Sequence, residues 1–205
     1  MKKLFIALLA SLLVLVSGCA ADGKADIKDR NDVVISVNGK DYKKGQFYDA
    51  LIENNAEGII INKLVDMIYS KYINEDDSEI ELASGKIKIF MYCHQGIGIG
   101  SYNGDAILNV SDKCSVNITT SGISVTGIGS LKGIATIHSS ADISMSCTGA
   151  SSVGIGILED GEGSIVIEKG KISLKMRSAK HTCIGTINGN ADTKISNAVI
   201  EIDSE

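Results

Sequence analysis

Cysteine and histidine come close together twice in the sequence. His94 follows Cys93, and Cys183 lies two residues after His181. Thiolates and imidazoles are ligands that zinc prefers, so the two pairs raise the question of a shared metal site. They fall in the first and fourth units of a sequence repeat, which corresponds to about 14 Å if each unit adds one strand spacing. That separation is too large for one ion, and we predict no metal site and no cofactor.

The four cysteines of the repeat region do not occupy equivalent positions in their units. They are Cys93, Cys114, Cys147 and Cys183. A disulfide needs Cα atoms about 4.4–6.8 Å apart. Cys93 and Cys147 lie two units apart, which is outside that range. We therefore interpret the cysteines as small buried thiols rather than as a disulfide framework.

Acidic residues gather in the turns after the glycine-rich segments. They are Asp105, Glu159, Asp160, Glu162 and Asp192. A hydrolase or lyase would need paired carboxylates on adjacent units, together with a basic partner, and no such pair is evident. The segment 159–163 also lacks the alternating ligands of a calcium loop. We interpret these residues as solvated turns and predict a non-enzymatic protein, with a polysaccharide-active enzyme as the third alternative.

Aromatic side chains are the usual platforms of sugar-binding faces, and the repeat region has few of them. It contains Phe90, Tyr92 and Tyr102. Tyr102 lies in a glycine-rich loop, where its ring would be accessible. Tyr102 is therefore the candidate carbohydrate-binding residue.

A Gly-Ile-Gly tripeptide repeats through the second half of the chain. It occurs at 98–100, 127–129 and 154–156, and returns as Cys-Ile-Gly at 183–185, with spacings of 29, 27 and 29 residues. A period of this size indicates stacked structural units. The glycines would allow positive φ or close approach between units, while the isoleucine points inward.

Pairs of alternating apolar residues recur between these tripeptides. The first apolar residue of the second strand in each unit falls at 87, 116, 143, 172 and 200. Polar turns such as 83–85 and 168–170 separate the two strands of a unit. Stacking aligns the isoleucines into ladders. We predict a mainly β fold, a right-handed parallel β-helix of about five rungs of roughly 28 residues over 78–205. A Greek-key or flat sandwich is the alternative.

Composition excludes one class of partner. The chain has 205 residues, a net charge of −5, 22 glycines, no proline and no tryptophan. A nucleic-acid-binding protein needs a basic face to neutralise phosphates. We therefore predict no nucleic-acid partner.

The N-terminus carries an export signal. Lys2 and Lys3 precede an apolar run from Leu4 to Val16, which is too short for a comfortable transmembrane helix. The ending Val-Ser-Gly-Cys at 16–19 resembles a bacterial lipobox. The resemblance implies a signal peptide over 1–18, lipidation of Cys19, and anchoring outside the cytoplasmic membrane. A plain signal peptide is the alternative. Residues 19–31 are predicted to form a tether.

Residues 32–77 are predicted to form a small helical module. A valine-rich run at 33–37 ends at the turn signal Asn38-Gly39. A helix is expected from about Lys44, with Phe47, Ala50 and Leu51 on one face. A second helix is expected over about 59–72, with an apolar stripe of Ile60, Leu64, Met67 and Ile68.

The order of these elements carries a second resemblance. Val-Asn-Gly at 37–39, Phe47-Tyr48 and Lys71-Tyr72 resemble the N-terminal segment of the PrsA foldase lipoproteins and the related SurA chaperones. The likeness covers about 45 residues. The parvulin domain that catalyses prolyl isomerisation in PrsA is not evident. A capping module without chaperone activity is the alternative.

The combined expectation is a lipid-anchored, extracytoplasmic binding or scaffold protein. The foldase resemblance implies chaperone-like contact with unfolded secreted polypeptides through Phe47, Leu51, Leu64 and Ile68. The second alternative is binding to cell-surface carbohydrate or cell-wall glycan by the repeat region, which also resembles glycine-rich repeats of bacterial surface proteins.

Overall fold

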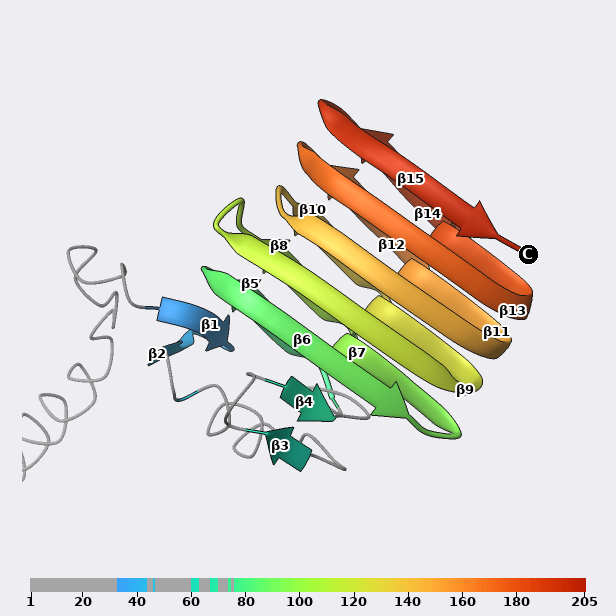
Figure 1. Cartoon of the computed structure of the whole chain (residues 1–205), viewed down its shortest axis with the longest axis horizontal. Coiled ribbons are helices and arrows are strands. Elements are labelled where there is room, and N and C mark those ends of the chain that lie inside the picture. Colours follow the sequence, from blue (N-terminus) through green and yellow to red (C-terminus); the bar gives the residue numbers. More distant parts are fainter. Residues whose placement is uncertain (1–32, 44–45, 47–59, 63–66, 70–73, 75) are drawn as a thin grey trace, which may run out of the picture. The chain divides into compact units, whose positions relative to one another are not determined.

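The repeat region winds into a parallel β-solenoid of about five coils (Figure 1). The computed structural model describes residues 33–43, 46, 60–62, 67–69, 74 and 76–205. The predicted solenoid over 78–205 is thus confirmed, and the sandwich alternative is wrong because consecutive units pair in parallel. Right-handed winding stays a prediction.

Each coil contributes one short strand and one longer strand. The short strands are β5 (Ser78–Leu82), β8 (Ala106–Val110), β10 (Ala135–Ser139), β12 (Glu162–Ile167) and β14 (Asn190–Ile195). The longer strands are β6 (Gly85–Tyr92), continued by β7 (Gln95–Ser101), then β9 (Cys114–Lys132), β11 (Asp142–Glu159), β13 (Gly170–Thr186) and β15 (Ala198–Ser204). We call the sheet of short strands sheet A and the sheet of longer strands sheet B.

Period-2 alternation decides which side chains form the core. In β8, Ala106, Leu108 and Val110 are buried, whereas Ile107 is 48% exposed. The strands stack in exact register, so that Leu108, Ile137 and Ile165 form one ladder in sheet A. A facing ladder in sheet B contains Val116, Ile143 and Ile172. Each ladder removes its apolar side chains from water, which a single coil could not do alone.

The longer strands bend and continue as the Gly-Ile-Gly wall. Ile99, Ile128 and Ile155 pair in register along it and are fully buried. Gly129 has φ of +138°, and a Cβ built there would overlap the carbonyl oxygen of Gly156 in the next coil. Glycine is therefore required here both by backbone conformation and by the close approach of adjacent coils. The predicted role of these glycines is confirmed.

A hairpin covers the first edge of sheet A. Strands β1 (Val33–Val37) and β2 (Lys40–Lys43) pair through the predicted turn at Asn38-Gly39. Strand β1 runs antiparallel to β5, and the Asn38 Oδ1 accepts a hydrogen bond from the Glu79 N–H at 2.9 Å. Ile35, Val37 and Tyr42 join the solenoid core. The hairpin acts as a cap on the first coil.

The second helix predicted for the N-terminal module is wrong for the residues that the structure describes. Ile60–Asn62 forms strand β3 and Met67–Tyr69 forms strand β4, and the two pair antiparallel. Strand β4 pairs in parallel with β6. The open edge of sheet B offers these two segments backbone partners, and that tertiary pairing overrides a weak helical periodicity. The helix expected from Lys44 lies outside the described residues.

No helix long and apolar enough to cross a membrane occurs in the described ranges.

Replacing a glycine of the inner wall tests the stacking of coils. We expect Gly129→Ala to lower the free energy of unfolding by about 3 kcal/mol or more, because it combines a strained φ with a backbone clash. Gly39→Ala is the matched control: φ is +77°, but no atom lies within 4 Å of the added Cβ. It should cost only about 1–2 kcal/mol. Urea unfolding measures both, and equal losses would contradict the close approach of coils.

Candidate functional site

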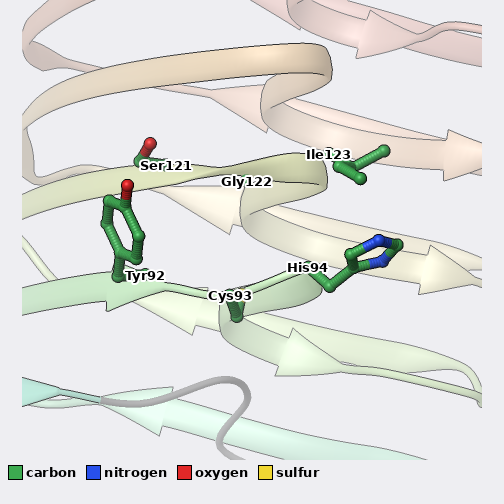
Figure 2. Close-up of a pocket in the computed structure, with 6 residues that line it drawn as sticks. All are labelled: Tyr92, Cys93, His94, Ser121, Gly122 and Ile123. Carbon is green, nitrogen blue, oxygen red and sulfur yellow. The ribbon is translucent and has the colours of Figure 1, made fainter.

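The most exposed aromatic side chain of the described residues stands at a corner of the first coil. Tyr92 is 90% exposed at the end of β6. It borders a shallow depression of about 420 Å³ lined by Tyr92, Cys93, His94, Ser121, Gly122 and Ile123 (Figure 2). The depression is therefore open to solvent and carries a free aromatic ring at its rim.

The corner owes its shape to a column of small residues. Between β6 and β7 the strand breaks at Cys93 and His94, while β9 runs through the same corner at Gly122. A Cβ on Gly122 would overlap the carbonyl oxygen of Cys93, and one on Gly149 would overlap that of Gly122. Small residues let the coils stack closely here, and their missing side chains leave the depression.

Backbone hydrogen bonds hold the corner rigid despite the break in the strand. The Cys93 N–H donates to the Ser121 carbonyl oxygen at 3.1 Å. The His94 carbonyl oxygen accepts two hydrogen bonds, from the N–H groups of Ile123 and Ser124 at 2.9 and 3.0 Å. Tyr92 thus projects from a fixed backbone.

A flat face rich in hydroxyl groups extends from Tyr92 across the outside of sheet B. We call this the hydroxyl face. It consists of the outward uncharged polar side chains of β9 and β11: Ser115, Asn117, Thr119, Ser121, Ser144, Ser146 and Thr148. The exposed Asp142 lies next to this face, beside Ser115. They stand in register, with Ser144 beside Asn117 and Thr148 beside Ser121. Strand spacing places neighbouring rows about 4.8 Å apart.

The side chains of the hydroxyl face are not engaged in hydrogen bonds with other described side chains or backbone groups. None of them has a side-chain hydrogen-bond partner among the residues that the structure describes. Serine, threonine and asparagine both donate and accept hydrogen bonds. A rigid array of such groups is ready to bind a polar ligand without first breaking protein–protein hydrogen bonds.

Charged residues bound the hydroxyl face on the side of the fourth coil. Arg177 occupies the column of Tyr92, Ser121 and Thr148. Its guanidinium contacts Asp203 at 2.8 Å and Glu205 at 3.2 Å. The hydrogen bond from Arg177 lowers the pKa of Asp203 below its usual value. The aromatic group and the charged cluster therefore lie at opposite borders of the face.

Tyr102, the candidate from the sequence, sits in a different environment. It is half-buried, its hydroxyl donates to the Gln95 Oε1 at 2.8 Å, and the Lys132 ammonium lies 5.9 Å from the ring centroid. The ring packs against a second apolar cluster that contains Leu131, Val153 and Leu158. Tyr102 and Tyr92 thus belong to separate surroundings, and Tyr92 offers more free ring surface.

Sequence reasoning missed Tyr92, although a signal was present. Ile87, Ile89 and Met91 alternate with Lys88, Phe90 and Tyr92, so strand parity alone places Tyr92 outward. The same parity places the hydroxyl face outward. The sequence could not show that the strand breaks beside Tyr92 and leaves its ring clear of neighbours.

Most of the other predicted site residues lie outside the described part of the chain. These are Cys19, Phe47, Leu51 and Leu64. Ile68 is in β4, where its backbone pairs with that of Ile89 in β6.

The four cysteines of the solenoid form no disulfide bond among the described residues. Burial raises the pKa of Cys114 to about 11, and the Cys114 Sγ donates to the Leu82 carbonyl oxygen at 3.1 Å. Burial also raises the pKa values of Cys147 and Cys183. Cys114 and Cys147 are buried as predicted, whereas Cys93 and Cys183 are half-exposed.

The acidic turn residues support the backbone. The Asp105 carboxylate accepts a hydrogen bond from the Ile134 N–H at 2.8 Å, which joins the second coil to the third. Asp160 takes a positive φ of 34° in the turn between β11 and β12. Among the described residues, no group of three histidine, cysteine or acidic side chains is placed to hold a metal ion.

Comparison of the chain with protein-family models, with curated proteins and with solved structures finds no match.

Thiol alkylation tests the burial of the cysteines. In the native full chain at pH 8, we expect Cys93 to react first and Cys183 more slowly. Cys114 and Cys147 should stay unmodified, because both thiols are buried and burial raises the pKa of each. With a pKa of about 11, the Cys114 thiol is only about one part in a thousand thiolate at that pH. Peptide mass spectrometry gives the rates, with the denatured chain as control. Modification of Cys114 as fast as Cys93 would contradict the buried environment.

Proposed function

We propose that this chain is a non-enzymatic, extracytoplasmic protein that binds an extended glycan of the cell surface or cell wall on the hydroxyl face. The single observation behind the proposal is the combination of uncommitted hydroxyl groups with the exposed ring of Tyr92 at their border. Lipidation of Cys19 would anchor the protein to the membrane, and the solenoid would hold the face rigid. Right-handed winding of the coils, which parallel crossovers favour, belongs to the same proposal.

The chemistry of the face suits a polysaccharide better than an apolar ligand. A sugar ring presents hydroxyl groups at its edge and an apolar surface of C–H groups on its face. The edge would hydrogen-bond to the hydroxyl face, and the apolar surface would stack on Tyr92. Because the face is already ordered, binding costs little conformational entropy in the protein.

The chaperone-like alternative, implied by the foldase resemblance, has less support. Both β1 and β4 pair with the first coil, which favours the capping role for the N-terminal module. A cap uses its strands to cover sheet edges, and it needs no client. We therefore keep client binding as an outcome that experiments can reveal.

Two substitutions on the hydroxyl face test glycan binding. We expect Tyr92→Ala and Ser144→Lys each to weaken binding to cell-wall polysaccharide at least tenfold, whereas Tyr92→Phe keeps the ring and should stay within threefold of the wild type. Thr136→Lys is the matched control, because Thr136 points outward from sheet A instead. Retention on immobilised polysaccharide and isothermal titration give the affinities. Failure of the wild-type chain to bind, or equal losses in all the lysine variants, would contradict the proposal.

The anchor is tested separately. We expect Cys19→Ser to remove the lipid attachment point, so that metabolic labelling with a radioactive fatty acid no longer marks the protein. The wild-type chain should be labelled and should partition with the membrane fraction. An unlabelled wild-type chain would support the alternative of a plain signal peptide.

A further inference from the structure

Within the described residues, strand pairing differs between the two ends of the solenoid. At the first end, β1 and β4 pair with β5 and β6. At the other end, β14 and β15 are the last strands of their sheets, and within the described residues no strand pairs with their outer edges (Figure 1). An open edge leaves backbone N–H and C=O groups in position to pair with another strand.

The core ladders also end uncovered at this face. Thr193 and Ile195 continue the ladders of Ile165 and Ile167, and Ile195 is 43% exposed. In β15, Ile202 continues the ladder of Leu174 and is 54% exposed. We call this surface the end face. It consists of the outer edges of β14 and β15 and the apolar side chains between them.

The sequence of β14 is complementary to itself in the antiparallel direction. If β14 pairs with β14 of a second copy about Thr193, Asp192 stands opposite Lys194 of the second copy and Lys194 opposite its Asp192. Ala191 then stands opposite Ile195. Neither Asp192 nor Lys194 forms an ion pair within the described part of the chain, so both are free to pair across copies. Opposite charges directly across an antiparallel pair are stabilising.

Strand β15 can also pair antiparallel with β15 of the second copy. Pairing about Ile200 places Ala198 opposite Ile202 and Val199 opposite Glu201, so no like charges face each other. The two acidic groups of β15 have basic partners within the chain: Glu201 contacts Lys171 at 2.9 Å, and Asp203 contacts Arg177.

One symmetry axis serves both strands. The corner between β14 and β15 is Ser196-Asn197. Thr193 lies three residues before Ser196, and Ile200 lies three residues after Asn197, so the two residues stand at equal distances from the corner. Both belong to inward ladders, because they pair with the buried Ile165 and Ile172. One two-fold axis perpendicular to the sheets can therefore relate both Thr193 and Ile200 to their copies.

We propose that the end face is the interface of a homodimer in which two copies join their solenoids end to end by antiparallel pairing of β14 with β14 and β15 with β15. The contact is isologous, which means that both copies use the same surface. It is therefore complete with two copies and does not extend into a fibre. The axis keeps the outer face of sheet B on one side of the dimer. The hydroxyl faces of both copies then point the same way and double the length available to a polymeric ligand. The dimer itself does not depend on that ligand.

A charge exchange tests the pairing in solution. Sedimentation equilibrium of the full chain in detergent, carrying Cys19→Ser so that no lipid drives association, should give twice the 21.6 kDa chain mass. Lys194→Asp places two acidic pairs across the interface and should raise the dissociation constant about tenfold or more. The double variant Asp192→Lys/Lys194→Asp restores opposite charges and should return the constant to within threefold of the starting value.

Cross-linking tests the register independently of affinity. Only Thr193 and Ile200 meet their own copies, so Thr193→Cys and Ile200→Cys should each form a disulfide-linked dimer under mild oxidation. Val199→Cys, at the exposed side of the same edge, is the control and should cross-link much less. A wild-type chain that stays monomeric at all concentrations, or one whose end face pairs with a different polypeptide, would overturn the proposal. Equal cross-linking at all three positions would do the same.

Discussion

Close approach of backbones along the Gly-Ile-Gly wall is the constraint on which the rest of the solenoid depends. Adjacent coils stack one strand spacing apart on every wall, and at Gly100, Gly129 and Gly156 that spacing leaves no room for a Cβ. The positive φ at these positions turns the wall so that the neighbouring isoleucines point into the core. The same register then aligns the ladders of both sheets. Loss of contact at this wall would therefore disturb the packing of the whole coil rather than one turn.

This stacking places one set of side chains in the core and the alternate set on the surface. Because the inward ladders supply the apolar core, the outward residues of β9 and β11 that form the hydroxyl face are not needed for core packing and display polar groups on the surface. The exposed Tyr92 adds an aromatic group at the border of that surface. The two ends of the stack also differ in strand pairing: strands of the N-terminal module cover one pair of sheet edges, whereas no strand among the described residues pairs with the outer edges of β14 and β15. The surface proposed for a ligand and the surface proposed for association would thus both follow from one repeat.

The sequence predicted the solenoid well because its signal is repetitive. The isoleucine pairs, at a period near 28 residues, predicted the coils. The polar turns predicted the corner between the two strands of each coil, and the glycines predicted the third wall. The sequence failed at the N-terminal module, where Ile60–Asn62 and Met67–Tyr69 form strands. These short segments have little intrinsic preference, and their conformation is decided by the open edge of β6, which periodicity cannot reveal. The sequence suggested Tyr102 as an accessible aromatic residue, whereas the most exposed ring among the described residues is that of Tyr92, beside the hydroxyl face, because a local break of the strand decides exposure.

The parallel, in-register stack is the central claim, and a distance between its first and fifth coils tests it most directly. Glu79 and Asp192 lie in one column of sheet A, through Ile107, Thr136 and Ser164. Four strand spacings place their Cα atoms about 19 Å apart although they are far apart in the sequence. Double electron–electron resonance measures this distance between spin labels on cysteines at 79 and 192, with Cys19, Cys93 and Cys183 replaced by serine and the labelled chain diluted in unlabelled chain. The stack predicts one narrow distribution near that separation, allowing for the label arms. A main distance beyond about 35 Å, or several separate populations, would contradict it.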